Sequence, residues 1–386
     1  MSVKKPLVFS LVVVYRDREL LRVERFLDSL QHQTRQDFEL IFIDYGSQPN
    51  SQKDIQTLVE KYAFAQYIYT NTRGWFWNRS KALNLGIHQA NNDNIITLDI
   101  DLIFEPDFLT KVAKKFSLTH YTRFTYYYLP QNFQDFAKLF SDNHQPEKHL
   151  DKTNPATNFG ILAFTKAIFL KAGGYDEYYQ VWGLEDIDFV KRLEASGTTS
   201  QGFIEGLRVY HQWHPKSQPQ LAKGWYEQMH QYFQKQPEKR PLKNIFQTPS
   251  VITINQRPAL QLKAIQDTAG FEFTFPKELS FVRFIYLFEQ LKPGQNLRVQ
   301  QRFAFIENHQ STKWGRLMHR INQFFIKLKV SYRWVDLDQF NSELILKKEV
   351  SDFLFHFLIV WQSQIADYYF DHQTDADSLE LILIKK

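Results

Sequence analysis

The amino-acid sequence predicts an α/β protein with a mostly parallel sheet flanked by helices, followed by a smaller C-terminal α+β domain. Over the first half of the chain, apolar runs typical of strands buried on both faces alternate with segments of helical periodicity. Such alternation is typical of strand, helix, strand units and favours a parallel sheet. The length of 386 residues exceeds the usual size of one hydrophobic core, so we expect two domains.

The expected elements follow one another in a regular order. The apolar run 7–15 predicts the first strand, and apolar residues at helical spacing predict a helix at 20–30. The later elements are a strand at 38–43, a helix at 55–62, a strand at 67–69, a helix at 81–90, a strand reaching Asp99, a helix at 185–194 and a strand at 207–210. Arg16, Asp44 and Asp99 fall at the carboxyl ends of strands, where α/β sheets bind their ligands.

Two carboxylates interrupt the otherwise apolar stretch 94–106. If the strand persists this far, Asp99 and Asp101 point to the same side of it, because side chains alternate with period two. Neighbouring carboxylates beside a buried sheet need a divalent cation, a basic partner or a raised pKa. Carboxylate oxygens suit Mg²⁺ or Mn²⁺ carrying a phosphate. The alternative is that the pair ends the strand and caps the turn before Pro106.

An acidic cluster beside aromatic residues follows later in the chain. Glu185, Asp186 and Asp188 suit the first turn of a helix, where the helix dipole stabilises negative charge. Trp182 and Gly183 lie directly before them. A flat apolar side chain next to carboxylates also suits the binding of a sugar ring. Both a structural and a sugar-binding role are therefore open for this cluster.

Composition excludes several classes of protein. The chain has no cysteine, which excludes disulfides, zinc thiolate sites and a cysteine nucleophile. The net charge of +5 is mild and the acids are interspersed, so we expect no nucleic-acid partner. The N-terminal apolar run is too short for a signal peptide, and the run 353–361 is too short to span a membrane. We therefore expect a cytoplasmic protein.

The C-terminal third differs in character from the rest. Prolines and basic residues at 235–250 indicate an exposed linker, so we expect a domain at 1–245 and a second at 250–386. Strands are expected at 251–254, 271–275 and 298–306. The stretch 313–333 carries six Lys or Arg and no acid along an amphipathic helix. Such a helix either packs on the core of its own domain or lies on anionic lipid. In the second case the protein would contact the inner membrane surface peripherally.

Five stretches together resemble a known family. They are Tyr-Arg-Asp-Arg at 15–18, Asp-Tyr-Gly-Ser at 44–47, Asn-Arg-Ser-Lys-Ala-Leu-Asn-Leu-Gly at 78–86, Asp-Ile-Asp at 99–101 and Trp-Gly-Leu-Glu-Asp-Ile-Asp at 182–188. In this order they resemble the nucleotide-sugar glycosyltransferases of the GT-A fold. Within that family the chain is similar to β-1,4-galactosyltransferases and to bacterial chondroitin-polymerase-type transferases, over roughly residues 6–235.

The resemblance implies how a UDP-sugar donor is bound. Arg16, Asp44 and Arg79 would hold the uridine diphosphate, and Asp99 would lie near the ribose and diphosphate. The chain departs from the broader inverting family at Tyr45, where a second acid is usual. The uridine contacts are therefore less well defined by the resemblance than the metal site.

The resemblance also implies a metal site and a catalytic base. Asp101 would bind Mn²⁺ or Mg²⁺ directly, with Asp99 as a further candidate. His211 would be the second ligand, and His214 is the alternative. The roles of the acidic cluster follow in the same way: Trp182 and Gly183 would contact the bound sugars, and Asp186, beside Glu185, would be the general base.

The expected function is inverting transfer of a hexose or N-acetylhexosamine from a UDP-sugar to a hydroxyl of a saccharide or glycolipid acceptor. A metal ion neutralises the charge that develops on the leaving diphosphate, and a carboxylate accepts the proton of the acceptor hydroxyl. We expect a place in surface polysaccharide or glycoconjugate synthesis. Two other classes stay open: a nucleotidyltransferase with the same carboxylate pair, and a catalytically silent carbohydrate-binding protein.

Overall fold

The computed structural model describes residues 7–136, 139, 150, 159–181, 183–215, 223–234, 271–275, 280–302, 347–361, 364–371 and 378–386. The chain divides into two compact units, Met1–Ala259 and Leu260–Lys386. The linker expected at 235–250 lies outside the described residues. The domain boundary near 245 therefore stays a prediction.

The N-terminal unit is built on a seven-stranded sheet with the order β3-β2-β1-β4-β8-β6-β9. Its strands are β1 (Phe9–Tyr15), β2 (Phe38–Asp44), β3 (Ala65–Tyr69), β4 (Asn94–Leu98), β6 (Tyr121–Arg123), β8 (Leu162–Thr165) and β9 (Ser200–Phe203). The pairings of β1 with β2 and β4, of β2 with β3 and of β6 with β9 are parallel. Only β8 runs against its neighbours in this sheet as described. The expected α/β class with a mostly parallel sheet is confirmed.

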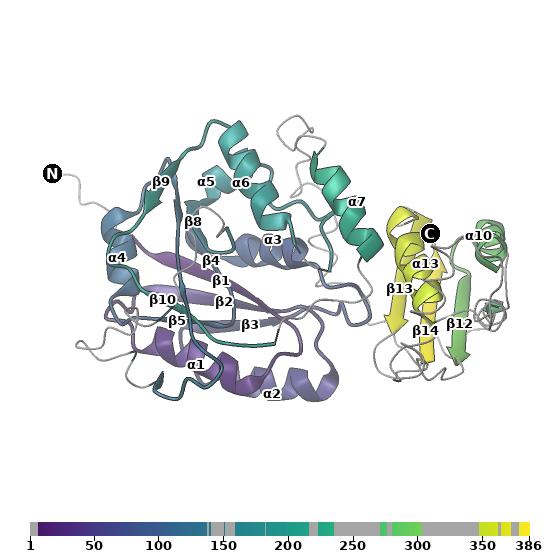
Figure 1. The fold of residues 1–386 in the computed structure, drawn as a ribbon, viewed down its shortest axis with the longest axis horizontal. Coiled ribbons are helices and arrows are strands. Elements are labelled where there is room, and N and C mark those ends of the chain that lie inside the picture. Colours follow the sequence, from purple (N-terminus) through teal and green to yellow (C-terminus); the bar gives the residue numbers. More distant parts are fainter. Residues whose placement is uncertain are drawn as a thin grey trace, which may run out of the picture. The chain divides into compact units, whose positions relative to one another are not determined.

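Helices cover both faces of this sheet (Figure 1). Residues of α1 (Leu20–Gln31), α2 (Pro49–Val59) and α4 (Phe108–Lys115) share one core cluster, and those of α3 (Arg79–Gln89), α5 (Lys166–Lys171) and α6 (Glu185–Ala195) share the other. Strand β1 joins the two clusters because its side chains alternate: Leu11 and Val13 face the first, and Val12 and Val14 face the second. Its burial on both faces explains its continuous apolar sequence.

Capping residues explain where two helices differ from the sequence expectation. Helix α2 begins at Pro49, six residues earlier than expected, because proline suits the first helical turn. Helix α3 begins at Arg79 because the side chain of Asn78 accepts a hydrogen bond from the backbone N–H of Lys81 at 2.8 Å. Both helices therefore start closer to the carboxyl edge of the sheet than apolar periodicity alone predicts.

A second, three-stranded sheet positions the candidate site. It consists of β5 (Leu102–Phe104), β10 (Val209–His211) and β7 (Tyr127–Tyr128), in the order β5-β10-β7. Strand β4 ends at Leu98, and Asp99, Ile100 and Asp101 form the turn that leads from the large sheet into the small one. The expectation that Asp99 and Asp101 share one face of a strand is therefore wrong, because the chain changes sheets between them.

The C-terminal unit contains a four-stranded sheet with two helices. The strands, in the order β11-β12-β14-β13, are β11 (Phe271–Phe273), β12 (Asn296–Arg302), β14 (Ser378–Lys385) and β13 (Ile365–Asp371), and the helices are α10 (Ser280–Gln290) and α13 (Lys347–Val360). Phe284 of α10 packs against Phe353 and Phe357 of α13. This additional sheet domain agrees with the expected α+β class. The strand expected at 251–254 and the basic helix at 313–333 lie outside the described residues.

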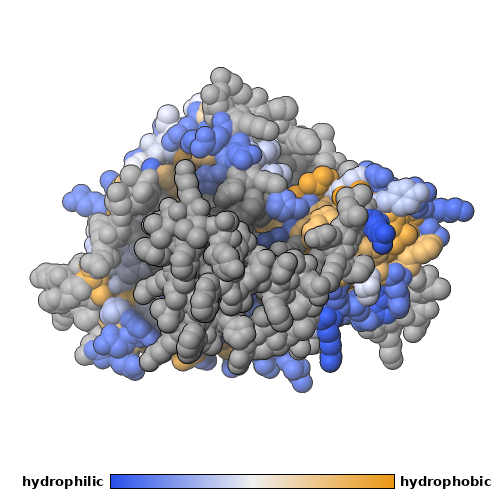
Figure 2. All heavy atoms as spheres, turned by 45° about the vertical axis from the view of Figure 1, so that its right-hand side comes forward, coloured by the Kyte–Doolittle hydropathy of each residue, from blue (hydrophilic) through white to orange (hydrophobic). Residues whose placement is uncertain are grey.

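The surface of the described residues mixes hydrophilic and hydrophobic side chains (Figure 2). Single large hydrophobic side chains are exposed on both units, for example Leu118 in the first and Tyr286 and Val360 in the second. None of the helices that the structure describes combines the length and apolar character that a membrane span requires. A further described helix, α7 (Lys223–Gln234), lies in the N-terminal unit.

Candidate active site

The sequence-predicted site residues gather around the carboxyl ends of β1 and β4. These two strands are neighbours, but the chain continues from β1 to β2 and β3 on one side and from β4 toward β8 on the other. Ligands of α/β sheets bind at such a switch in strand order. Arg16 directly follows β1 and Asp99 directly follows β4, so both begin the loops that line this position.

Asp101, His211 and His214 form a cluster with the geometry of a metal site. Oδ2 of Asp101 lies 3.5 Å from Nε2 of His211 and 3.1 Å from Nε2 of His214. One potential ligand atom from each residue lies within 4.8 Å of the others. His211 and His214 were expected as alternatives, and the structure brings both to Asp101.

The small sheet sets the distance between residues that are far apart in the sequence. Strand β10 pairs antiparallel with β5, so that His211 lies opposite Leu102. The backbone N–H of Gln212 then donates to the carbonyl of Asp101 at 2.8 Å, which extends the pairing past the strand ends. The ring of His211 stacks on Tyr126, with 5.3 Å between the ring centroids. His211 is thus held on its backbone and on one ring face.

The electrostatics of the cluster favour an ionised carboxylate. Burial would raise the pKa of Asp101, but the hydrogen bond from His214 and the nearby His211 outweigh it and lower the pKa below the ordinary value. The same hydrogen bond raises the pKa of His214. Metal ligands must be deprotonated, so protons compete with a metal for His214 and metal affinity should fall at low pH.

The residues present fit a divalent ion. Two ligands that are about 2.1 Å from one ion and at right angles lie about 3 Å apart, which is close to the spacing of these side chains. Oδ1 of Asp101 and Nδ1 of His211 are buried without a hydrogen-bond partner among the described residues. Two imidazoles and one carboxylate suit Mn²⁺ better than Mg²⁺, which prefers oxygen ligands.

Asp99 belongs to a second cluster, centred on Arg79. Nη2 of Arg79 donates to Oδ1 of Asp99 at 2.7 Å and to the carbonyl of Gly160 at 3.0 Å. Nη1 of Arg79 lies 3.7 Å from Oε1 of Glu185. A Cβ atom on Gly160 would lie 2.9 Å from Oδ2 of Asp99, so a larger residue there would require the carboxylate to shift. Arg79 therefore joins the turn after β4 to the first turn of α6.

Glu185 and Asp186 form a pair of largely buried carboxylates at the start of α6, where the side chain of Glu185 is 13% exposed. Burial raises the pKa of both side chains, and that of Glu185, which also feels Asp186, rises to about 7. Arg79 opposes the rise in both cases. The backbone N–H of Ile187 donates to Oδ1 of Asp186 at 2.7 Å. A carboxylate with a raised pKa near neutrality is suited to general acid or base catalysis.

The loop before α6 is strained. Val181 and Leu184 have φ angles of 70° and 74°, a region that residues with a Cβ rarely adopt, and Gly183 has a φ of 94°. Strained backbone of this kind is concentrated at functional sites, where the surrounding structure maintains it. Here it directs the acidic first turn of α6 toward Arg79. Trp182 lies outside the described residues, so its expected contact with sugar stays a prediction.

Arg16 holds backbone groups of the surrounding loops. Its guanidinium donates to the carbonyls of Tyr45 at 2.5 Å, Trp75 at 2.8 Å and Thr72 at 3.1 Å. These contacts connect the end of β1 to the turn after β2 and to the loop before α3. Its expected contact with uridine diphosphate stays a prediction, and in this structure the side chain shapes the loops around that position.

Asp44 is also engaged within the protein. Its side chain is fully buried, accepts the backbone N–H of Ser47 at 2.9 Å and accepts the hydroxyl of Tyr67 at 2.7 Å. Burial raises the pKa of Asp44 above its ordinary value. The next turn requires Gly46, because a Cβ there would lie 2.5 Å from the backbone nitrogen of Arg73. A direct contact of Asp44 with the donor stays a prediction.

Tyr126 is a site residue that the sequence reasoning missed. Burial and the nearby Asp99 raise the pKa of its hydroxyl, and Asp101 adds to this effect. Tyr126 therefore lies close to both aspartates while its ring stacks on His211. The aromatic run Tyr-Tyr-Tyr at 126–128 is the only local signal, and the sequence has too many aromatic residues for such a run to be distinctive.

Comparisons with known proteins agree with the resemblance seen in the sequence. Residues 10–171 match the family described as Glycosyl transferase family 2, and residues 144–214 match the N-terminal domain of galactosyltransferase. Two overlapping parts of the N-terminal unit therefore match glycosyltransferase family 2 and galactosyltransferase-like domains. The resemblance to glycosyltransferases is confirmed.

Three individual proteins illustrate these matches. Human chondroitin sulfate synthase 3 is 28% identical over 207 residues, which cover 50% of this chain and 23% of that protein. Chondroitin synthase of Pasteurella multocida is 26% identical over 224 residues, covering 47% and 22%. The chain thus spans less than a quarter of the length of these relatives. A crystal structure of GalNAc-T7 with UDP, GalNAc and Mn²⁺ has a TM-score of 0.43 at 17% identity and covers 66% of this chain and 55% of that chain.

Proposed function

We propose that the protein is an inverting, metal-dependent glycosyltransferase that moves a hexose or N-acetylhexosamine from a UDP-sugar to a hydroxyl of a saccharide acceptor. The observation that carries the proposal is the turn Asp99–Asp101, which joins two clusters. Asp101 contacts the two histidines, and Asp99 contacts Arg79 and through it the carboxylates of α6. This arrangement supports a site for a metal and diphosphate beside a site for a base.

Asp101, His211 and His214 would hold the metal ion. When bound, a divalent ion supplies positive charge that stabilises the diphosphate leaving group. Because two of the three ligands are imidazoles, we propose Mn²⁺ rather than Mg²⁺. Tyr126 and Tyr128 contact the ring of His211 and fix its orientation.

Arg79 would contribute to donor binding with the charge that it already places near Asp99. Its Nη1 is buried and has no hydrogen-bond partner among the described residues, which leaves an N–H group for an oxygen of the donor. A buried guanidinium is a strong electrostatic partner for a phosphate because little water competes with it. Such fixed positive charge near a leaving group contributes strongly to catalysis.

Asp186 would accept the proton of the acceptor hydroxyl. One of its oxygens accepts the N–H of Ile187 at 2.7 Å, and the other would face the acceptor hydroxyl. Glu185 would keep a proton up to a pH of about 7, because burial and the neighbouring Asp186 raise its pKa to about 7. A single base opposite the leaving group leads to one displacement and therefore to inversion of the anomeric centre. General base catalysis of this kind contributes about 10²- to 10⁴-fold.

The proposal extends to the acceptor and to the place of the reaction. Two of the relatives are named chondroitin synthases, which supports a growing polysaccharide as acceptor. The net charge of +5 is compatible with an acidic glycan. We propose that the C-terminal unit helps to hold this acceptor, and we keep the cytoplasmic side of the inner membrane as the expected place of synthesis.

The test is a transfer assay read by proton NMR. The full chain is incubated with Mn²⁺, a panel of UDP-hexoses and UDP-N-acetylhexosamines, and saccharide acceptors. We expect one donor to give a product whose new linkage has the opposite anomeric configuration. Retention of configuration would contradict the single-displacement mechanism. Absence of any transfer, with sugar binding intact, would instead favour a carbohydrate-binding protein.

A further inference from the structure

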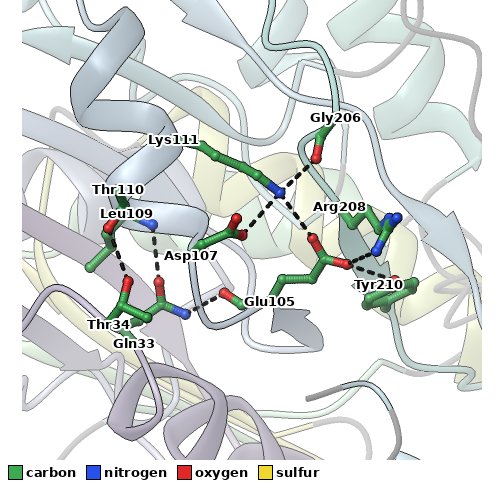
Figure 3. Close-up of polar contacts among 10 residues, drawn as sticks. All are labelled: Gln33, Thr34, Glu105, Asp107, Leu109, Thr110, Lys111, Gly206, Arg208 and Tyr210. Carbon is green, nitrogen blue, oxygen red and sulfur yellow. Dashed lines mark hydrogen bonds and ion pairs between the residues drawn. The ribbon is translucent and has the colours of Figure 1, made fainter. Parts of the chain in front are cut away.

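Glu105 lies where β5 ends and the chain turns toward α4 (Figure 3). Its side chain is 9% exposed. Oε1 lies 2.7 Å from Nη1 of Arg208 and accepts the hydroxyl of Tyr210 at 3.3 Å. Oε2 lies 3.4 Å from Nζ of Lys111. The proposed reaction uses none of these four residues, which form a polar network. Glu105 and Tyr210 are buried, whereas Arg208 and Lys111 are partly exposed.

The network lies at one end of the short ladder between β5 and β10. Phe104 pairs with Val209, and Leu102 pairs with His211. Glu105 and Arg208 directly follow and precede these strands at one end, whereas Asp101 and the imidazole of His211 meet at the other. At about 3.3 Å per residue, four residues of strand place the two ends about 13 Å apart.

The register of so short a ladder needs additional support. A slip by one residue turns every side chain of a strand to the opposite face, so it would remove His211 from Asp101. A cross-strand charge pair opposes such a slip. Here a slip would also leave the carboxylate of Glu105 buried without Arg208, which is strongly unfavourable. The ion pair therefore favours one register over its neighbours.

Glu105 is itself anchored to two helices. Nε2 of Gln33, beyond the end of α1, donates to the carbonyl of Glu105 at 2.7 Å, and Oε1 of Gln33 accepts the N–H of Leu109 in α4 at 3.0 Å. Lys111 also donates to the carbonyl of Gly206 at 2.8 Å and so holds the loop that leads into β10. Figure 3 shows both connections. The network thus joins β10 to a fixed part of the fold.

We propose that Glu105 is a positioning residue that locks the register of β10 on β5 and thereby holds His211 beside Asp101 for metal binding. The inference rests on the metal site of the proposed function. A residue at the far end of the ladder, without contact to the metal, would thus determine how firmly His211 is held beside Asp101.

The test measures Mn²⁺ affinity by electron paramagnetic resonance of free Mn²⁺ in the full chain. We expect Glu105→Gln and Arg208→Gln to weaken Mn²⁺ binding about tenfold, in the range found when residues that orient metal ligands are lost. Arg208→Lys keeps the charge and should restore most of the affinity. Amide hydrogen exchange at 209–212 without metal should accelerate in the two glutamine variants.

Asp107→Asn is the matched control. Asp107 also pairs with Lys111, at 3.0 Å, and the substitution removes the same charge from the same network, but this ion pair lies within the α4 segment. We expect its Mn²⁺ affinity to equal that of the unaltered protein. If Asp107→Asn weakens binding as much as Glu105→Gln, local charge rather than register is responsible and the inference is overturned.

The remaining outcomes separate this inference from the proposed function. If the unaltered protein binds Mn²⁺ and both Glu105→Gln and Arg208→Gln bind it equally well, the inference fails while the metal site stands. If they only lower the melting temperature, the network is purely structural. If the unaltered protein binds no Mn²⁺, the metal site itself is contradicted, and the positioning role falls with it.

Discussion

The two histidines of the metal cluster are held in different ways. Nδ1 of His214 lies 2.9 Å from the carbonyl of Pro215, an arrangement that directs Nε2 toward Asp101, where it would bind a metal. His211 lies in β10 and stacks on Tyr126 instead. Each ring therefore has an orientation suited to a metal ligand. The sequence predicted His211 as the ligand and His214 only as its alternative.

We predict that His211→Ala and His214→Ala each weaken Mn²⁺ binding at least about tenfold, because even residues that only orient ligands have effects of this size. Isothermal titration calorimetry with Mn²⁺ measures it. His32→Ala, at an exposed histidine beyond the end of α1, is the control and should bind normally. If only one of the two variants binds Mn²⁺ more weakly, only that histidine is a ligand. If neither does, the cluster is not the metal site.

The carboxylates of α6 predict a pH profile. A base must be deprotonated, and burial raises the pKa of Asp186 above its ordinary value, so kcat/KM should rise with pH over a range above that of an ordinary aspartate and then level off. Asp186→Asn should lower kcat with little change in donor binding. Glu185→Gln should keep activity and move the rise to lower pH, because Asp186 loses a negative neighbour. If Glu185→Gln is the inactive variant, the base is Glu185.

The raised pKa of Glu185, at the start of α6, makes the stability of the folded protein depend on pH. Glu185 has a pKa of about 7 in the folded protein, against about 4.3 in an unfolded chain. Between these values the folded state binds a proton that the unfolded state lacks, so stability falls as pH rises from about 4 to 7. Glu185→Gln should therefore raise the melting temperature at pH 8 and leave it nearly unchanged at pH 4. A lower melting temperature at pH 8 would mean that the contact with Arg79 outweighs burial.

Helix α3 shows that part of a sequence motif acts through packing. Asn84 is fully buried, and its side chain exchanges two hydrogen bonds of 2.9 Å with the backbone N–H and carbonyl of Tyr175. Asn84→Leu would leave both backbone groups unpaired, so we predict a loss of about 2–4 kcal/mol in the free energy of unfolding, measured with urea. Asn50→Ala, at an exposed position of α2, should change little. If Asn84→Leu is as stable as the unaltered protein, the packing role of Asn84 is contradicted, and a direct role of the motif in binding is favoured.

At the scale of the whole molecule, the division into two units predicts separable tasks. A fragment containing residues 1–259 should fold, bind UDP with Mn²⁺ and slowly hydrolyse the donor, since the residues of the proposed site lie within Met1–Ala259. Transfer to the natural acceptor should fall if the C-terminal unit holds it. The measurement compares UDP release with product formation. Transfer at the full-length rate would contradict the acceptor role, and insolubility would contradict separate folding.

Local sequence patterns predicted four strands of the large sheet, β1 to β4, because burial of a strand leaves an apolar run, as in β1, but they did not predict β6, β8 and β9. They failed at Asp99 and Asp101 because the step from one sheet to another depends on pairing with β10, more than a hundred residues later. The same pairing brings His214 to Asp101. Glu105 and Tyr126 had no motif at all, since their roles arise from contacts between distant elements.

The most direct test of the account is the rate of UDP release as a function of free Mn²⁺, measured on the full chain with its preferred UDP-sugar and acceptor. In the unaltered protein the rate should rise from near zero in chelator to a plateau. Asp101→Asn, which keeps the size of the side chain, should stay near zero at every Mn²⁺ concentration while its melting curve stays cooperative. Full activity in chelator, or of Asp101→Asn, would contradict the central claim that Asp101 and its two histidines hold the catalytic metal.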